Sequence, residues 1–280
     1  MKEGVMTDSG IEEAASAIRR AEALVITAGA GMGVDSGLPD FRGDEGFWRA
    51  YPPLKEKGLS FAEMASASWF RTDPVLAWGF YGHRLHLYRN TVPHRGFQIL
   101  RDIAEHMTKG VFVYTSNVDG QFQRAGFSEN AIVECHGSIH HLQCATPCES
   151  TIWSAEDTQV NVDETTFLAS RPLPRCPSCG NVARPNILMF GDWVWVGDRS
   201  EKQSERFRRW EDNIGNSRLV VIELGAGTAI PSVRSMSERL VRRSNGTLVR
   251  INVREAQVPP GQIGIAGTAL ATLERLTLHT

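Results

Sequence analysis

The stretch Ala23-Leu24-Val25-Ile26-Thr27-Ala28-Gly29-Ala30-Gly31-Met32-Gly33 runs from an apolar segment directly into a glycine-rich turn. A short apolar run that ends in glycine predicts a buried strand, and the small residues after it let backbone amides approach a pyrophosphate at a helix N-terminus. Such turns also occur where a strand simply packs closely against a helix. The turn alone therefore does not decide between these two interpretations.

Three more apolar runs repeat this design further along the chain. They cover residues 111–115, 219–224 and 247–252, and the stretches between them are long enough for helices. Residues 11–22 have helical periodicity and are expected to pack before the first strand. Strands that alternate with helices predict a parallel sheet covered on both faces. The expected fold class is therefore α/β, with a Rossmann-like, doubly wound parallel sheet.

Four cysteines stand in two close pairs, Cys144 with Cys148 and Cys176 with Cys179. Thiolates two to four positions apart can bind one tetrahedral ion together, so the two pairs predict a zinc site. Four thiolates leave no open coordination position, which makes the ion structural. The alternatives are disulfides or unpaired core thiols. A disulfide needs an oxidising compartment, and no apolar signal segment precedes Ile11.

The cysteine segment and the tryptophan- and tyrosine-containing residues 46–90 predict a second, smaller lobe. Residues 46–90 show helical patterns and no convincing strand, and the polar segment 149–175 is expected to be a loop. We expect a Rossmann-like domain, a helical part of the small lobe and a zinc-binding module. Their expected boundaries are 1–45, 91–140 and 184–280 for the first, 46–90 for the second and 141–183 for the third.

Composition narrows the possible classes of protein. The chain has 280 residues, is 41% hydrophobic and carries a net charge of −2, so it can bury a sizeable core. Lys and Arg are spread along the chain and give no basic excess for non-specific nucleic-acid binding. No apolar run approaches the roughly 20 residues that span a bilayer. We expect a cytoplasmic protein without nucleic-acid or membrane partners, and the fifth cysteine, Cys135, fits a reducing compartment.

The loop after the glycine-rich turn carries three complementary groups in a row. In Ser36-Gly37-Leu38-Pro39-Asp40-Phe41-Arg42, an acid, an aromatic ring and a cation occupy consecutive positions. A carboxylate accepts from an amide, an arginine binds a phosphate, and a phenyl ring shields a reactive cation from water. This loop favours the ligand-binding interpretation of the preceding turn.

In identity and order, the motifs of the chain resemble those of the sirtuins, a family of NAD-dependent protein lysine deacylases. The resemblance extends from about Ile11 to Leu276. Its segments are Gly29-Ala30-Gly31, Ser36 to Arg42, Thr115-Ser116-Asn117-Val118-Asp119, His136-Gly137, the two cysteine pairs, Arg184-Pro185 and Phe190-Gly191. It implies an NAD-binding Rossmann-like domain, a small zinc and helical lobe, and deacylation of protein lysines with nicotinamide and O-acyl-ADP-ribose as products.

The resemblance also implies roles for single residues. The implied NAD contacts are Ala28, Gly29, Gly31, Asp40, Phe41, Arg42, Ser116, Asn117, Asp119, His136, Gly225 and Asn252. Among them, Asp40 would hold the nicotinamide amide. His136 would be the general base, with Asn117 and Asp119 lining the nicotinamide and ribose subsite. Phe190 and Gly191 would pair with an extended substrate peptide by strand addition.

Several residues depart from the sirtuin pattern. Ser116 replaces a glutamine, Gly33 replaces a serine, and the second turn, Gly225-Ala226-Gly227-Thr228, has neither the expected threonine nor the expected serine in its place. ADP-ribosyl transfer to protein or NAD hydrolysis on the same fold therefore stays open, as does a noncatalytic NAD-sensing or zinc-scaffold module. A histidine before glycine is also commonly a structural residue, so His136 has that second interpretation.

Three residues concern the identity of the acyl group. The run Phe80-Tyr81-Gly82-His83-Arg84 resembles the bacterial type of sirtuin that accepts acidic acyl groups, and Ala65 falls where that subgroup keeps a small residue. Tyr81 and Arg84, three apart on a helix, share a face and can bind a succinyl or malonyl carboxylate. The alternative is that both only pack the helix against its neighbours. Trp193 and Trp195 leave a similar choice between a peptide platform and core packing.

Overall fold

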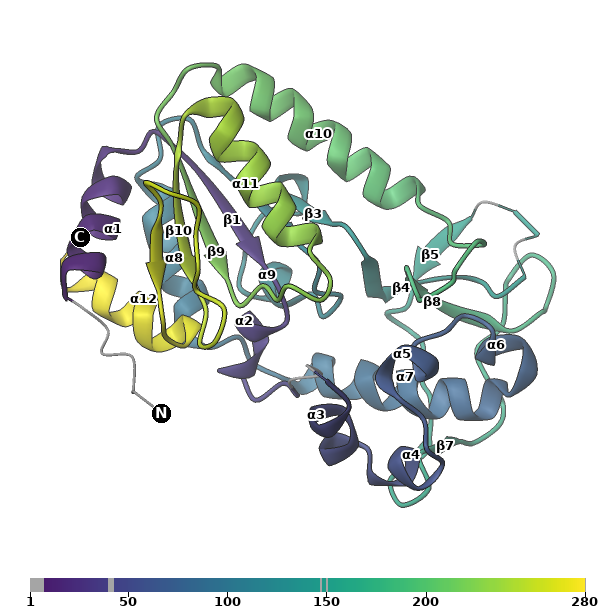
Figure 1. The fold of residues 1–280 in the computed structure, drawn as a ribbon. Coiled ribbons are helices and arrows are strands. Elements are labelled where there is room, and N and C mark those ends of the chain that lie inside the picture. The colour runs from purple at the N-terminus through teal and green to yellow at the C-terminus, as the bar shows by residue number, and fades with distance from the viewer. Residues whose placement is uncertain (1–7, 40–42, 147, 150, 280) are drawn as a thin grey trace.

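The computed structural model of the chain describes residues 8–39, 43–146, 148–149 and 151–279. Figure 1 shows a larger lobe built around a sheet and a smaller lobe of short helices and strands. Within the described residues, six parallel strands form the sheet of the larger lobe in the order β11-β10-β9-β1-β2-β3. They are β1 (Ala23–Ala28), β2 (Val111–Thr115), β3 (Ile132–Glu134), β9 (Leu219–Leu224), β10 (Thr247–Ile251) and β11 (Ile263–Ile265).

The strand order changes direction next to β1, which lies in the middle of the sheet. The chain proceeds outward through β2 and β3, and then returns to β9 on the other side of β1. This is a doubly wound sheet, as the spacing of apolar runs predicts. In such sheets, ligands bind at the carboxyl ends of the strands beside the point where the order reverses. The ends of β1 and β9 therefore mark the place to look for a site.

Helices cover both faces of this sheet (Figure 1). Side chains of β1 alternate between the two faces, because successive residues of a strand point in opposite directions. Leu24 and Ile26 join a cluster with α1 (Asp8–Arg20), α8 (Arg95–Glu105) and α12 (Ala269–Thr277). Ala23 and Val25 join a cluster with α10 (Asp198–Ile214) and α11 (Ser232–Ser244). Shorter elements of this lobe are α2 (Gly31–Val34), α9 (Gln121–Arg124) and the 3-10 helix η1 (Glu129–Ala131).

The smaller lobe combines the helical segment with the cysteine segment. Its helices are α3 (Gly43–Ala50), α4 (Pro52–Glu56), α5 (Phe61–Met64), α6 (Trp69–Thr72) and α7 (Pro74–Asn90). Its strands are β4 (Gly137–Cys144), β5 (Ile152–Ser154) and β8 (Ala183–Ile187), which are antiparallel, and the pair β6 (Val162–Asp163) with β7 (Leu168–Ala169). The polar segment between the cysteine pairs is thus not only a loop, because it contains β5, β6 and β7.

The buried helix α7 holds this lobe together. It begins where the Asp73 carboxylate accepts from the Leu76 amide at 3.0 Å, with Pro74 in the first turn, a favoured arrangement at a helix start. Trp78 on α7 donates its indole N–H to the carbonyl of Ala183 on β8 at 2.8 Å. Apolar side chains from residues 47–88 and 139–189 share one cluster. The expected boundaries at 46–90 and 141–183 stay a prediction.

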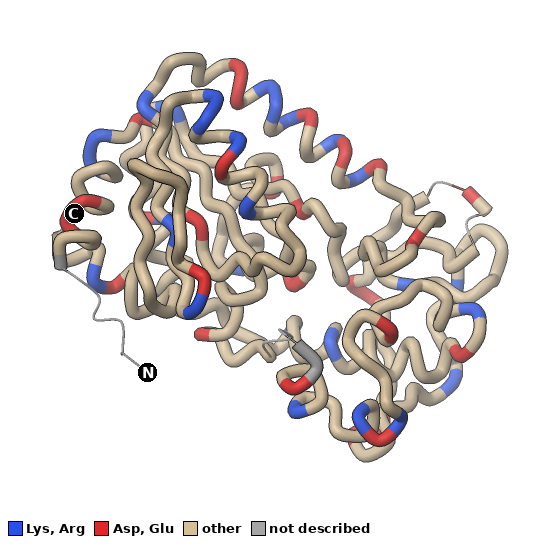
Figure 2. Tube along the Cα trace, viewed as in Figure 1, with Lys and Arg blue, Asp and Glu red and all other residues tan. Residues whose placement is uncertain are grey.

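Charged residues of both signs are interspersed on the surface. Figure 2 shows this most clearly along α10, where blue and red positions follow one another. None of the described helices is both long and apolar enough to cross a membrane.

Candidate active site and zinc site

Two glycine-rich turns meet at the carboxyl ends of β1 and β9. The Gly31 amide donates to the Gly225 carbonyl at 3.1 Å, and the Gly29 amide donates to the Leu224 carbonyl at 3.0 Å. A β-carbon on Gly29 would lie 2.8 Å from the Cα of Ala226, and one on Gly225 would lie 2.4 Å from the Cα of Gly31. The absence of side chains lets the two backbones touch. This junction lies where the strand order of the sheet reverses.

Side chains from outside the turns lie against both of them near the positions that depart from the sirtuin pattern. A β-carbon on Gly33 would lie 2.9 Å from the Cδ1 of Leu38, so a larger residue would have to displace that side chain. In the second turn, the amide and the hydroxyl of Thr228 both donate to the carboxylate of Glu255. A carboxylate therefore lies against the second turn.

Asn252 lies behind the second turn, 1% exposed. Its side-chain amide donates to the Ala226 carbonyl at 2.8 Å, and its side-chain oxygen accepts from the amides of Arg254 and Glu255. Arg234 on α11 donates to the carbonyls of Ala226 and Glu255. The side chain of Asn252 thus links the second turn to the loop that follows β10 by hydrogen bonds.

Residues after β2 are tied to the first turn. The side-chain amide of Asn117 donates to the Gly29 carbonyl at 3.0 Å, and the Asn117 backbone amide donates to the Thr115 hydroxyl at 3.0 Å. The Ser116 amide donates to the Ala28 carbonyl at 3.1 Å. Ala28, Gly29, Ser116 and Asn117 are therefore brought together at the end of β1, as expected for a common site.

Asp119 is a buried carboxyl group, 7% exposed. Its Oδ1 accepts from the Gln121 amide at 2.9 Å, and its backbone carbonyl contacts His140 Nε2 at 2.9 Å. Burial raises the pKa of the Asp119 carboxyl to about 6, against the opposing effects of the Gln121 hydrogen bond and the charge of Arg84. The carboxyl group therefore changes charge within reach of physiological pH.

His136 lies between β3 and β4, where the chain passes from the larger lobe to the smaller one. Its Nε2 lies 3.4 Å from the hydroxyl of Ser232, the first residue of α11, which follows the second glycine turn. Its carbonyl accepts from the Leu188 amide at 2.9 Å. Burial lowers the pKa of His136, which favours the neutral imidazole and leaves one ring nitrogen able to accept a proton.

The four paired cysteines converge on one point. The sulfur atoms of Cys144 and Cys179 are 3.7 Å apart, as are those of Cys148 and Cys176, and all four lie within 4.8 Å of one another. Tetrahedral zinc with Zn–S bonds of about 2.3 Å separates its sulfur ligands by about 3.8 Å, whereas a disulfide needs about 2.05 Å. The cluster therefore fits a structural zinc ion, and none of the five cysteines, Cys135 included, forms a disulfide.

The segment after β8 is tied to His136, whose carbonyl accepts from the Leu188 amide, and to the small lobe. The Phe190 amide donates to the Ala65 carbonyl at 3.0 Å, and Phe190 forms a parallel bridge with Ser66. Gly191 has a φ of +63°. Phe190 is 43% exposed and Trp193 is 96% exposed, so Trp193 is not a core residue. Ala65, Phe190 and Gly191 are therefore brought close together, although they are far apart in sequence.

A buried ion pair stabilises the segment after β8. The side chains of Arg184 on β8 and Asp192 are both fully buried, and their charged groups are 2.7 Å apart. Asp192 also accepts from the amides of Met189 and Val194. The carboxylate thus fixes the turn that carries Phe190 and Gly191.

Tyr81 and Arg84 on α7 are buried and share a face, as their spacing predicts. The Arg84 guanidinium lies 5.4 Å from the centre of the Tyr81 ring and 5.2 Å from that of Phe80. Its Nε and Nη2 donate to the Tyr88 hydroxyl at 3.0 and 2.8 Å. Burial raises the pKa of Tyr81 to about 12, so its hydroxyl stays protonated at neutral pH. The Arg84 guanidinium is therefore surrounded by aromatic rings. Its positive charge opposes the rise in the pKa of the Asp119 carboxyl.

Comparison with known proteins identifies the family. A family profile described as the Sir2 family matches residues 29–212. The chain belongs to the Sir2 family. A Daphnia pulex protein named NAD-dependent protein deacylase is 31% identical over 206 residues, which are 68% of this chain and 71% of that protein. A Pyrococcus furiosus protein of the same name is 29% identical over 249 residues, which are 89% of this chain and 88% of the relative.

Solved Sir2 structures have the same fold over almost the whole chain. A Sir2 homologue in complex with NAD has a TM-score of 0.72 at 26% identity and covers 96% of this chain and 93% of its own. A Sir2 homologue variant in complex with ADP-ribose also has a TM-score of 0.72 at 26% identity and covers 96% and 95%. The α/β fold class, the second lobe and NAD as the co-substrate of the family are thereby confirmed.

Part of the expected site lies outside the described residues, and two residues near the described part were not expected from the sequence. Asp40, Phe41 and Arg42 lie outside the described residues, so their roles stay predictions. Sequence reasoning also missed Ser232, which contacts His136, and Glu255, which contacts the second turn. Ser232 stands at the start of a helix, where serine is expected for capping alone. Glu255 lies in an irregular loop, so only the folded backbone brings either residue to the site.

Proposed function

We propose that this Sir2-family protein removes acyl groups from lysine side chains of proteins and consumes NAD as co-substrate. The observation that carries the proposal is the convergence of His136, Asn117 and the two glycine-rich turns at the switch point of the sheet. Relatives named NAD-dependent protein deacylase support it. They do not favour the alternative of ADP-ribosyl transfer to protein or NAD hydrolysis.

In this proposal, the glycine-rich turns and the loop after β2 bind the co-substrate. Ala28, Gly29, Gly31 and Gly225 offer closely packed backbone without large side chains, which suits a pyrophosphate. Asn117 and Asp119 would line the nicotinamide and ribose subsite, and Ser116 and Asn252 would complete the binding surface. Bound NAD supplies the ADP-ribose that accepts the acyl group, with release of nicotinamide.

His136 would act as the general base in this proposal. Its lowered pKa keeps the imidazole neutral near pH 7, so it can take a proton from a ribose hydroxyl. Its position on the connection between the lobes supports this role, because a substrate bound by the smaller lobe would meet there a co-substrate held by the larger lobe. The acyl oxygen of the substrate is a weak nucleophile. Its position against the ribose carbon therefore contributes more to the reaction rate than its nucleophilic strength.

The substrate would enter as an extended peptide that pairs with Phe190 and Gly191 by strand addition. We further propose that the acyl group is acidic, such as succinyl or malonyl, and that it meets Tyr81 and Arg84. A buried carboxylate needs a cation and a hydroxyl, and both are present on one face of α7; Ala65 is a small buried residue beside Phe190.

The test is NAD turnover with peptides that carry acetyl-, succinyl- or malonyl-lysine, read by mass spectrometry. We expect free lysine, nicotinamide and the matching O-acyl-ADP-ribose. Arg84→Met should reduce desuccinylation strongly and spare any deacetylation. Equal loss on both substrates would limit Tyr81 and Arg84 to packing, whereas no deacylation of any peptide would contradict the proposed function itself.

A further inference from the structure

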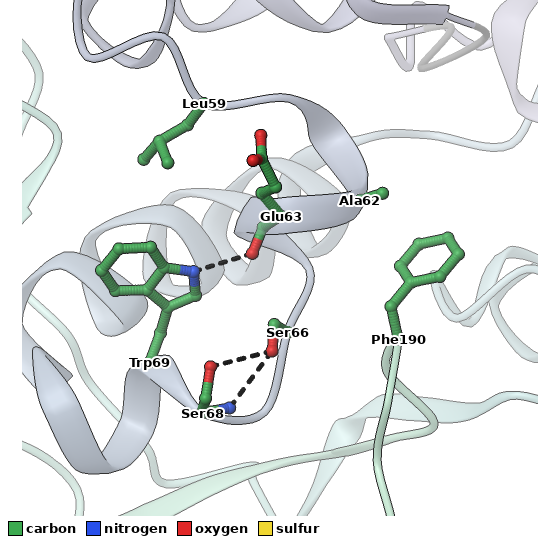
Figure 3. Close-up of a pocket in the computed structure, with 7 residues that line it drawn as sticks. All are labelled: Leu59, Ala62, Glu63, Ser66, Ser68, Trp69 and Phe190. Atoms are coloured by element: carbon green, nitrogen blue, oxygen red, sulfur yellow. Dashed lines mark hydrogen bonds between the residues drawn. The ribbon is translucent and has the colours of Figure 1, made fainter.

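A pocket of about 460 Å³ opens beside the proposed substrate segment. Figure 3 shows it between the loop and short helices of the small lobe and the ring of Phe190. Its lining residues are Leu59, Ala62, Glu63, Ser66, Ser68, Trp69 and Phe190. The parallel bridge between Ser66 and Phe190 joins its floor to the segment expected to pair with substrate. A peptide on that segment would therefore pass the mouth of this pocket.

The walls of the pocket are held in place by local hydrogen bonds. The Trp69 indole N–H donates to the Glu63 carbonyl at 2.7 Å, which fixes the plane of the ring (Figure 3). The Phe190 ring packs edge-on against Phe61 with centroids 6.2 Å apart. The Ser66 and Ser68 hydroxyls are 2.9 Å apart. The pocket thus has an ordered aromatic wall and an ordered pair of hydroxyl groups.

Glu63 carries the only charge among the described residues that line this pocket. Its carboxylate accepts from the Ser60 amide at 2.8 Å and from the Ser60 hydroxyl at 2.6 Å, as in a helix-capping box. These hydrogen bonds lower the pKa of Glu63, so the group is ionised at neutral pH. The pocket therefore combines an aromatic wall with one fixed negative charge.

We propose that this pocket binds a basic side chain, arginine or lysine, that lies a few residues from the acylated lysine in the substrate protein. The proposal rests on the deacylase function proposed above. The aliphatic stem of a basic residue can lie along Leu59 and the rings, while its charged head faces the Glu63 carboxylate, which points away from the two serine hydroxyls (Figure 3). An acidic residue would be repelled by this carboxylate, and an apolar one would give it no opposite charge.

The experiment uses acetyl-lysine and succinyl-lysine peptides in which arginine, alanine, leucine or glutamate is placed in turn at each of the neighbouring positions. We expect one position where arginine lowers KM by about threefold to tenfold relative to alanine, with kcat unchanged. Glu63→Gln should abolish that difference and leave the KM for NAD unchanged, because glutamine can still cap the helix. Glu56→Gln on α4, an exposed glutamate outside the pocket, is the matched control.

Peptide binding without NAD, measured by fluorescence anisotropy, separates this inference from the proposed function. An arginine preference in binding without any turnover would support the pocket and contradict the deacylase proposal. Turnover without a preference for arginine at any position, a preference for leucine over arginine, or an arginine preference that survives Glu63→Gln would overturn the inference.

Discussion

Gly225 is the residue where the meeting of the two turns leaves no space for a side chain. Its φ is +60°, and an added β-carbon would lie 2.4 Å from the backbone of Gly31. Gly225→Ala should lower the free energy of unfolding by about 1–3 kcal/mol, because alanine is strained in this left-handed conformation and its β-carbon forces the turns apart. Chemical denaturation measures the change.

Gly227→Ala is the matched control for Gly225→Ala. The nearest atom to its added β-carbon is a Glu255 carboxylate oxygen at 3.6 Å, which is ordinary contact. Equal stability losses in the two variants would mean that the turns do not pack as described.

Asp119 makes the stability of the fold depend on pH. The pKa of its carboxyl group is raised from 3.8 to about 6 by burial. Between these values the folded state holds a proton that the unfolded state releases, so the Asp119 contribution to stability falls as pH rises from about 4 to about 6. Asp119→Asn should therefore gain stability relative to the parent protein over this range and level off above it. A difference independent of pH, measured by denaturation at several pH values, would contradict the assigned burial.

At the scale of elements, the zinc cluster joins two strands that are far apart in sequence. Cys144 ends β4, and Cys176 and Cys179 stand before β8, so the metal ties together the ends of two paired strands. Cys176→Ser should remove zinc and unfold or precipitate the protein, since metal binding supplies folding free energy to small modules. Cys135→Ser is the control, because Cys135 is a free thiol outside the cluster. Elemental analysis should find one zinc per chain in the control, and pure active protein without zinc would refute the site.

Sequence patterns predict the long elements and miss the short ones. The four central strands are continuous apolar runs, so their positions are predicted to within a residue: 23–28, 111–115, 219–224 and 247–251 are observed. β3 and β11 have only three residues each, too few for a pattern, and pairing with a neighbour makes them strands. β5, β6 and β7 escape notice in a polar segment for the same reason.

The residues of the candidate site also fall into two groups, those that sequence motifs predict and those that only the structure reveals. Glycine turns, cysteine pairs and the Asn117 to His136 motifs are contiguous in sequence and can be identified there. Glu63, Ser232 and Glu255 reach their places only through folding: the Ser60 to Glu63 spacing predicts a helix start, but nothing in it predicts the pocket formed with Phe190. Functional residues can therefore be predicted where one segment contains all of them. They cannot be predicted where two distant segments come together only in the folded protein.

At the scale of the whole molecule, the site lies where the two lobes meet. In the proposed function, the larger lobe would contribute the turns at the switch point of its sheet, and the smaller lobe would contribute Ala65, Tyr81, Arg84 and the segment after β8. His136 lies on the connection between them. The proposed reaction needs NAD and an acyl-lysine at the same place. Neither lobe alone would bring the two together, so the reaction would need both lobes.

The coupling of NAD consumption to deacylation tests this account most directly. The protein is incubated with NAD, with and without an acyl-lysine peptide of the preferred type, and nicotinamide and free lysine are counted together. We predict equal amounts of the two products, no nicotinamide without peptide, and a loss of at least about a hundredfold in His136→Ala with NAD binding retained. Nicotinamide release that does not need the peptide, or turnover by His136→Ala close to that of the parent protein, would contradict the central claim.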